Sequence, residues 1–417
     1  MYLSSIDRPH AATTSRRRAL FLVSGNVFAL GAVSLITDIS SEMVTAVLPV
    51  YLMIGLHLSP TVYGVVDGTY TGATALLRLV GGYVADRASR RKFIAGLGYG
   101  LSAVAKLGLL AAGNAVGAIG AVIAIDRTGK GLRTAPRDAL ITLSTPPRLY
   151  GRAFGVHRMM DTIGAFAGPL VALAILAGTA QAYDAVFVAS FCIAAFGVLV
   201  LVLFVRDHRD EQPPKATVTP SALRGLLRIA PVRRLVLAAC LAGMVTIGDG
   251  FVYLLLQRRE ELSIGWFPLL AVGTNLSYLV LATPLGVLAD KIGRQKVVIG
   301  GYLALMLVYV LLFGPLGGWP LLIVVLGLYG LFYASTDGVL IALAGPVLPS
   351  GVRTTGIALI QTGQALSYLV SSVLFGLAWT TWGPTGAIRI AAAIAAVAVI
   401  VVALLLRRIA ADAEQPA

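Results

Sequence analysis

Residues 82–92 read GYVADRASRRK, and residues 286–294 read GVLADKIGR. Each segment ends an apolar run with Gly-x-x-Ala-Asp and opens a basic loop, and the two segments lie half a chain length apart. A second pair of segments is also repeated between the two halves of the chain. PRLYGRAFG at 147–155 is matched, with one gap, by LPSGVRTTG at 348–356. Repeats of this kind predict two related halves that pack around a shared site at mid-membrane.

The composition is too apolar for a water-soluble domain. Hydrophobic residues make up 58% of the 417 residues, charged residues make up 12%, and the mean hydropathy is +0.86. A soluble domain carries roughly twice that charged fraction. The chain is therefore predicted to have lipid as its solvent. Cys192 and Cys240 both lie in apolar runs and are expected to stay unpaired.

Long apolar runs recur along the whole chain, and a run of roughly 20 residues can cross a bilayer as a helix. We predict an all-α polytopic membrane protein with twelve transmembrane helices in two pseudo-symmetric six-helix bundles. The runs lie near residues 20–55, 61–85, 93–113, 114–138, 152–178, 183–205, 234–257, 264–289, 296–315, 319–345, 352–378 and 385–406. The predicted divisions are a cytoplasmic tail over 1–19, an N-terminal bundle over 20–205, a cytoplasmic linker over 206–233, a C-terminal bundle over 234–407 and a second cytoplasmic tail over 408–417.

Lysine and arginine gather in alternate loops. They fill the linker and the loops after the second, fourth and eighth runs, whereas the loops near His57, Gly113, Thr179 and Gly317 have almost none. Because cytoplasmic loops carry this excess, both termini are predicted to lie in the cytoplasm and the protein in the inner or plasma membrane. The net charge of +14 then reflects topology, and nucleic acid is not an expected partner. The four tryptophans all fall at the opposite, outer ends: Trp266, Trp319, Trp379 and Trp382.

The segment at 82–92 resembles the signature loop of the major facilitator superfamily, and the segment at 286–294 resembles its partial copy. The likeness covers essentially the whole chain and favours the bacterial drug and metabolite efflux branch. It implies a monomeric secondary transporter that works by alternating access. It also implies a cytoplasmic gate, in which an aspartate meets a neighbouring helix terminus, while the alternative is that the arginines only set topology. The implied gate residues are Gly82, Asp86, Arg87, Arg90, Gly286, Asp290 and Arg294.

The fourth apolar run carries charges where the bilayer is most apolar. Counting about 1.5 Å per residue from its outer end places Asp126 and Arg127 near mid-membrane. The sequence around Arg127 resembles the helix-4 motif of the superfamily, whose arginine is implicated in proton coupling. Charges at this depth face a cavity or a charged partner. The three cations Arg127, Lys130 and Arg133 lie within two helical turns, and they form either a coupling or anion-attracting surface, or internal ion pairs with Asp126 and Asp138.

Two carboxyl groups in the first run are the strongest candidates for proton binding. Asp38 and Glu42 are spaced four apart and therefore share one helix face. Two like charges in a low-dielectric site cannot both ionise cheaply, so one of them is expected to hold a proton. We predict that Asp38, Glu42, Asp126 and Arg127 couple protons to transport. The alternative for Asp38 is a purely structural hydrogen bond.

The other polar residues expected inside the membrane are candidates for the substrate cavity. Most of the charged ones lie in the first half, so coupling is expected there, and the second half is expected to recognise substrate shape. A Gly168-Pro169 pair resembles, incompletely, a motif of antiporters in the superfamily. The cavity candidates are Asp67, Lys106, Lys130, Arg133, Arg158, Asp161, Asp249, Asn275, Asp337, Gln361 and Gln364.

The function predicted from these features is proton-coupled efflux of a small organic compound. Symport or exchange of an organic anion is the alternative within transport, and a ligand-gated pore is the alternative class. An enzyme is not expected, because the sequence contains no nucleophile–base set and no metal-ligand spacing. No cofactor or metal is expected, and the expected partners are the substrate, protons and the lipid bilayer.

Overall fold

The computed structural model describes residues 24–87, 91–113, 115–146, 149–207, 225–336, 343–344, 347–348 and 353–414. For residues 78–87, 151, 353–355 and 410–414 it describes the backbone only. The principal elements of the described chain are helices, so the predicted all-α class is confirmed. In the first half they are α2 (Gly25–Val50) with a π-helical turn η1 (Tyr51–Gly55), α3 (Pro60–Arg87), α4 (Arg91–Ala112), α5 (Val116–Leu143), α6 (Tyr150–Gly178) and α7 (Tyr183–Phe204).

The second half repeats this arrangement with two departures. A membrane-length helix is divided into α9 and α10, and the last two predicted runs form one long element, α15. The elements are α9 (Ala230–Val245), α10 (Asp249–Arg259), η3 (Ile264–Trp266), α11 (Phe267–Ile292), α12 (Arg294–Leu311), α13 (Gly318–Thr336) and α15 (Arg353–Glu414).

The helix α15 reverses direction within its 62 residues, at Gly383. This residue has φ 72° and ψ 172°, a conformation that glycine adopts without the steric cost of a Cβ atom. Pro384 follows at once, and proline is well tolerated in the first turn of a new helix. The runs predicted at 352–378 and 385–406 are therefore joined by a sharp turn with almost no loop.

Nine helices in the described part of the chain are long and apolar enough to cross a membrane. The last of them, Gly356–Ile409, contains the turn at Gly383. The helices α3 and α5 are not among the nine, although both run alongside their neighbours, and both carry charged residues within their length. The chain is thus a multi-pass membrane protein, and the count of twelve crossings stays a prediction.

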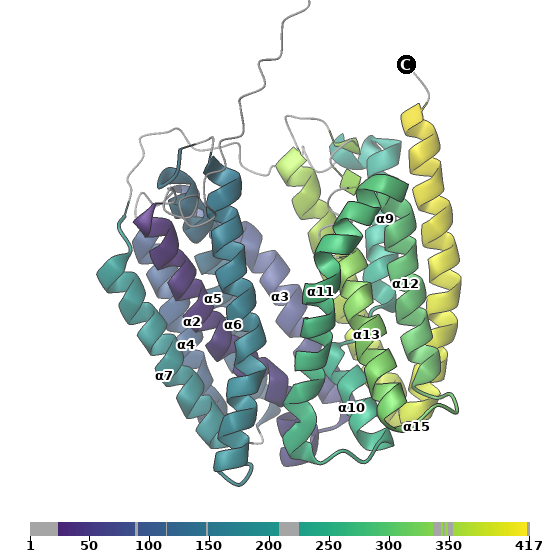
Figure 1. The fold of residues 1–417 in the computed structure, drawn as a ribbon, viewed down its shortest axis with the longest axis horizontal. Coiled ribbons are helices and arrows are strands. Elements are labelled where there is room, and N and C mark those ends of the chain that lie inside the picture. Colours follow the sequence, from purple (N-terminus) through teal and green to yellow (C-terminus); the bar gives the residue numbers. More distant parts are fainter. Residues whose placement is uncertain are drawn as a thin grey trace, which may run out of the picture.

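The helices form two bundles side by side, α2–α7 in one and α9–α15 in the other, with α3 between them (Figure 1). The helix α2 begins and α15 ends at the same end of the molecule. At the opposite end, which is the predicted outer end, α3 and α15 are tied together. The Thr61 hydroxyl lies 2.8 Å from that of Thr380 and donates to the Gly376 carbonyl oxygen at 3.3 Å. The two halves are therefore in contact at the predicted outer end.

The orientation in the membrane gives a first testable prediction. A fluorescent protein fused after Ala417 should fold and fluoresce, and alkaline phosphatase at the same position should be inactive, because the basic loops retain that side in the cytoplasm. A phosphatase fusion after Gly317, between α12 and α13, is the matched control and should be active. Phosphatase activity at Ala417 together with a dark fluorescent fusion would reverse the assignment.

Candidate transport site between the two halves

The charged residues of α5 reach its neighbours because α4 and α5 pack very closely. Gly98 and Gly129 face each other across the contact, and a Cβ atom on Gly98 would lie only 2.6 Å from the Gly129 carbonyl oxygen. Small residues at such a crossing allow two backbones to approach. The side chains of Lys106 on α4 and Asp126 on α5 are thereby brought together in the membrane interior.

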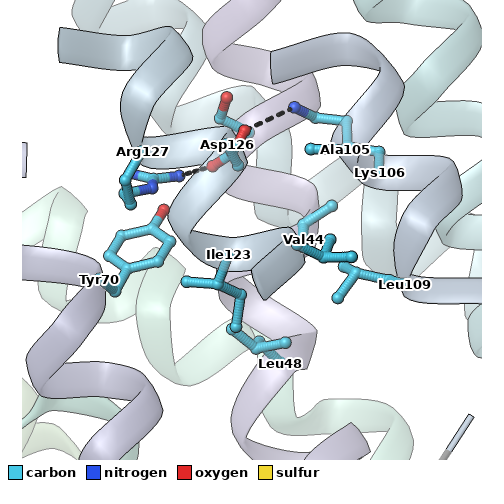
Figure 2. Close-up of a pocket in the computed structure, with 11 residues that line it drawn as sticks. Val44, Leu48, Tyr70, Ala105, Lys106, Leu109, Ile123, Asp126 and Arg127 are labelled. Carbon is cyan, nitrogen blue, oxygen red and sulfur yellow. Dashed lines mark hydrogen bonds and ion pairs between the residues drawn. The ribbon is translucent and has the colours of Figure 1, made fainter. Parts of the chain in front are cut away.

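The first group of charges surrounds Asp126, and we call it the Asp126 cluster (Asp126, Arg127, Lys106, Ser102 and Tyr70). Figure 2 shows all of these residues except Ser102. One carboxylate oxygen accepts from the Ser102 hydroxyl and lies 3.5 Å from Lys106 Nζ. The other oxygen is bonded by the Arg127 guanidinium, which lies over the Tyr70 ring at 3.4 Å from its centroid. The cluster therefore holds two cations against one anion.

The Asp126 cluster has no room for an organic molecule. The cavity beside it has a volume of about 20 Å³, which is the space of about one water molecule. The predicted alternative of internal ion pairs describes Asp126 and Arg127 in this structure. Asp138 lies elsewhere, 3.0 Å from the Arg137 guanidinium.

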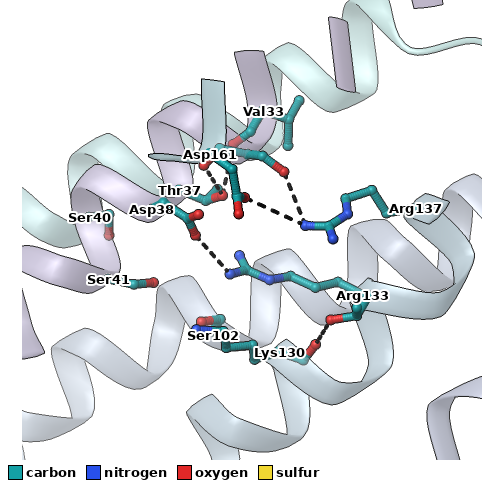
Figure 3. Close-up of polar contacts among 12 residues, drawn as sticks. Val33, Thr37, Asp38, Ser40, Ser41, Ser102, Lys130, Arg133, Arg137 and Asp161 are labelled. Carbon is teal, nitrogen blue, oxygen red and sulfur yellow. Dashed lines mark hydrogen bonds and ion pairs between the residues drawn. The ribbon is translucent and has the colours of Figure 1, made fainter. Parts of the chain in front are cut away.

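The second group of charges joins α2, α5 and α6, and we call it the carboxyl pair (Asp38 and Asp161) with its arginines (Figure 3). Asp38 lies 3.5 Å from the Arg133 guanidinium, and Asp161 lies 3.9 Å from that of Arg137 and 3.7 Å from that of Arg158. The side chains of Asp38 and Asp161 lie next to each other. Two carboxylates at close range repel each other, so this arrangement favours a proton on one of the two.

Glu42 lies one turn beyond Asp38 on α2 but has partly different neighbours. Its surrounding cations are Lys130 and Arg127, and Gly168 of α6 packs against its stem. The two acidic residues therefore share Lys130 and Asp161 as charged neighbours, but only Asp38 forms an ion pair with Arg133. The carboxyl group beside Asp38 is that of Asp161 on α6. The cation that pairs with Asp38 is Arg133.

A cavity of about 370 Å³ lies between the halves, within the usual size range of small-molecule sites. The first half contributes α6, and the second contributes α10, α11 and α13. Asp249 lines it from the start of α10, where its Oδ1 accepts from the hydroxyls of Tyr329 (2.7 Å) and Tyr333. Four of the predicted cavity residues lie here: Arg158, Asp161, Asp249 and Asn275.

The remaining predicted cavity residues lie elsewhere or outside the described part. Asp67 is on α3 and is half-buried against α15. Gln361 and Gln364 are on α15, and the backbone carbonyl of Gln364 packs against Gly243 of α9. Asp337 lies outside the described residues. Lys106 belongs to the Asp126 cluster, Arg133 pairs with Asp38, and Lys130 lies near Asp38 and Glu42.

Much of the predicted cytoplasmic gate also lies outside what the structure describes. Arg90 falls between described segments, and Gly82, Asp86 and Arg87 are in the backbone-only part of α3. In the second copy of the motif, Asp290 at the end of α11 pairs with Arg294 at the start of α12, at 3.4 Å. Gly286 is in α11, one turn before Asp290.

Sequence reasoning missed the tyrosines and the helix break. The hydroxyls of Tyr329 and Tyr333 donate to Asp249, and that of Tyr368 donates to Asp67. Neutral hydroxyl groups do not stand out in an apolar run as charged and amide groups do. The break between α9 and α10 falls inside the run predicted at 234–257 as one helix. The only local signal is a Gly-Asp-Gly sequence at 248–250.

Comparison with known sequences identifies the family of this fold. The family model described as Major Facilitator Superfamily matches residues 30–270 and 258–417. An uncharacterised MFS-type transporter of Methanocaldococcus jannaschii is 30% identical over 367 residues, which cover 86% of this chain and 89% of that protein. An uncharacterised protein of Mycobacterium tuberculosis is 32% identical over 203 residues, which cover 48% of this chain and 49% of that protein.

Solved structures of transporters have the same fold. The nucleoside transporter NupG superposes with a TM-score of 0.77 at 15% identity, covering 92% of this chain and 98% of that one. A POT family transporter in complex with a thioalcohol-conjugated peptide gives 0.78 at 13% identity, covering 95% and 100%. A bacterial homologue of the human lysosomal transporter Spinster, in an inward-facing conformation, gives 0.71 at 16% identity, covering 97% and 100%.

Proposed function

Because the chain belongs to the major facilitator superfamily, we propose that it is a secondary transporter that exchanges protons for a small organic compound with a cationic nitrogen. The family membership makes it a transporter and not an enzyme. Proton coupling, the direction of exchange and the sign of the substrate charge are the parts proposed here. They rest on the arrangement of carboxyl groups at the cavity between the halves.

The single observation that carries the proposal is the double position of Asp161. Its carboxyl group lies beside that of Asp38, where we propose that the pair holds one proton, and it also lines the cavity. A group that can hold either a proton or a bound cation, but not both, makes the two compete. When the cavity opens to alternate sides, competition for one site produces exchange of one species for the other.

The lining of the cavity favours a cationic substrate. Its described residues carry two carboxyl groups, those of Asp161 and Asp249, and one cation, Arg158, whose side chain is 79% exposed and paired with Asp161. Both tyrosine hydroxyls that hold Asp249 bond to Oδ1, so Oδ2 is held by neither of them. Phe166 and Tyr333 provide ring surfaces for an apolar body and for cation–π contact.

The alternative of organic anion symport or exchange is supported by Arg158, the one cation among the described residues that line this cavity. The two substrate classes predict opposite proton movements. An exchanger that imports an external cation releases protons from the vesicle, whereas a symporter that imports an anion brings protons in. A pore would move substrate without any coupled proton movement.

The test uses purified protein in proteoliposomes that contain a pH-sensitive dye. Permanently charged aromatic compounds are added outside, with benzyltrimethylammonium and benzenesulfonate as a pair matched in size. We expect cations to make the lumen alkaline at a saturable rate, and matched anions to have no effect. Lumen acidification by anions only, or substrate entry that a pH gradient does not alter, would contradict the proposal. Liposomes without protein are the control.

A further inference from the structure

The membrane crossing that opens the second half is broken in its interior. The helix α9 ends at Val245, α10 begins at Asp249, and residues 246–248 between them are not helical. The Tyr309 hydroxyl supplies hydrogen bonds to two backbone groups at this break. It donates to the Val245 carbonyl oxygen (2.8 Å) and accepts from the Ile247 amide (3.0 Å). Broken backbone inside a membrane protein persists only where such partners exist. The break is therefore a built part of the fold.

The carboxyl group of Asp67, on α3 of the other half, lies directly against this break. Gly248 leaves the necessary space, since a Cβ atom there would lie 2.8 Å from Asp67 Cγ. The first turn of α10 also packs on α3, with the rings of Tyr63 and Phe251 4.7 Å apart. The N-terminus of a helix carries a partial positive charge, so the start of α10 favours a carboxylate beside it.

Two hydroxyl groups of α15 hold the same carboxylate. Ser372 Oγ donates to Asp67 Oδ2 at 2.7 Å, and the Tyr368 hydroxyl donates to it at 3.0 Å. Nearer the predicted outer end, Thr61 and Thr380 make the contact described above. All of these contacts join one half to the other, so all of them must break when the halves separate at that end.

We propose that Asp67 is the residue that closes the outer gate, and that its release from the α9–α10 break accompanies opening to the outside. On the other side of Gly248 is Asp249, which lines the substrate cavity. Substrate bound at Asp249 and closure of the gate at Asp67 thus act on the same short segment. This shared segment links occupancy of the cavity to the state of the gate, and Asp67 is a positioning residue that does not touch substrate.

Disulfide formation between Thr61→Cys and Thr380→Cys measures how often the outer end is closed. The pair is placed in a background with Cys192→Ala and Cys240→Ala, which removes the native thiols. Losing hydrogen bonds to a charged group should shift the equilibrium toward the open form, and we expect the crosslinking rate to fall about tenfold in Asp67→Ala. Ser372→Ala and Tyr368→Phe should each give a smaller fall. The control Asp184→Ala removes an exposed carboxylate at the start of α7 and should change nothing.

A second variant tests the contact between the Asp67 carboxylate and Gly248. Gly248→Ala places a methyl group where the Asp67 carboxyl group lies, so it should lower crosslinking while Asp67 is present. In the double variant Gly248→Ala/Asp67→Ala the clash is gone, and crosslinking should be no lower than in Asp67→Ala alone. If Asp67→Ala does not reach the membrane, Asp67→Asn serves with the same expected direction. Unchanged crosslinking with a lowered melting temperature would make Asp67 merely structural and would overturn the proposal.

Discussion

Asp38→Asn is expected to abolish the accumulation of substrate against its gradient while preserving substrate binding and downhill exchange. The asparagine side chain retains a hydrogen-bonding oxygen for Arg133, which lies 3.5 Å from Asp38. It cannot take up or release a proton, so the proton site that we propose for the carboxyl pair is lost. Uptake driven by a pH gradient in proteoliposomes should fall to the level of protein-free vesicles, and counterflow exchange should continue.

Glu42→Gln is the matched control for this loss, because it neutralises a second acid on the same helix. Glu42 lies among the cations Lys130 and Arg127, whereas Asp38 lies beside the carboxyl group of Asp161 and pairs with Arg133. We therefore expect a milder reduction of gradient-driven uptake in Glu42→Gln. Accumulation at the wild-type rate by Asp38→Asn would exclude Asp38 as the coupling residue, whatever the behaviour of Glu42→Gln.

Asp126→Asn should have the largest effect on stability. It removes the only anion of the Asp126 cluster and leaves Arg127 and Lys106, each 5% exposed or less, without the counter-charge that this cluster supplies. Breaking a buried ion pair by removing one partner costs about 3–5 kcal/mol. The melting temperature in detergent should fall markedly, and less protein should reach the membrane.

Lys106→Met separates the effect of charge from that of side-chain shape in the same cluster. It removes one of two cations, so Asp126 and Arg127 remain as a balanced pair over the Tyr70 ring. The melting temperature should then change little. The double variant Lys106→Met/Asp126→Asn leaves one unpaired cation and should be more stable than Asp126→Asn. Equal destabilisation in Lys106→Met and Asp126→Asn would refute the charge-balance explanation.

The helices and the two halves could be predicted from sequence because they follow from local patterns. A run of apolar residues needs no partner to be recognised, and the helix α7 (Tyr183–Phe204) begins and ends within one residue of the run predicted at 183–205. The paired motifs at 82–92 and 286–294 supply the repeat and the family resemblance, which the family match confirms. The sequence also identifies Asp161 and Asp249 as cavity candidates, because charged residues inside apolar runs are easily recognised.

The partners of those charges could not be predicted, because they depend on how the helices pack. Spacing alone pairs Asp38 with Glu42 on one face, whereas close packing of α2 on α6 brings Asp161 to Asp38. Spacing does not show either that the Arg127 guanidinium is held by Asp126 and Tyr70, or that Arg133 is the cation paired with Asp38. The α9–α10 break depends on Tyr309, which is more than sixty residues further along the chain.

The charged character of α3 and α5 has a consequence for how the protein is made. An Asp, Lys or Arg at the centre of a helix opposes insertion by the translocon by roughly 2.5–3.5 kcal/mol, so these two helices enter the bilayer poorly on their own. The helix α5 can be received by α4, which is synthesised just before it and supplies Lys106 for Asp126. The helix α3 can pack on α2 and α5, but the hydroxyls of Ser372 and Tyr368, which hold Asp67, lie more than 300 residues further along the chain. The hydrogen bonds of Asp67 can therefore form only after α15 has been made, and truncation before α15 should expose α3 to membrane quality control.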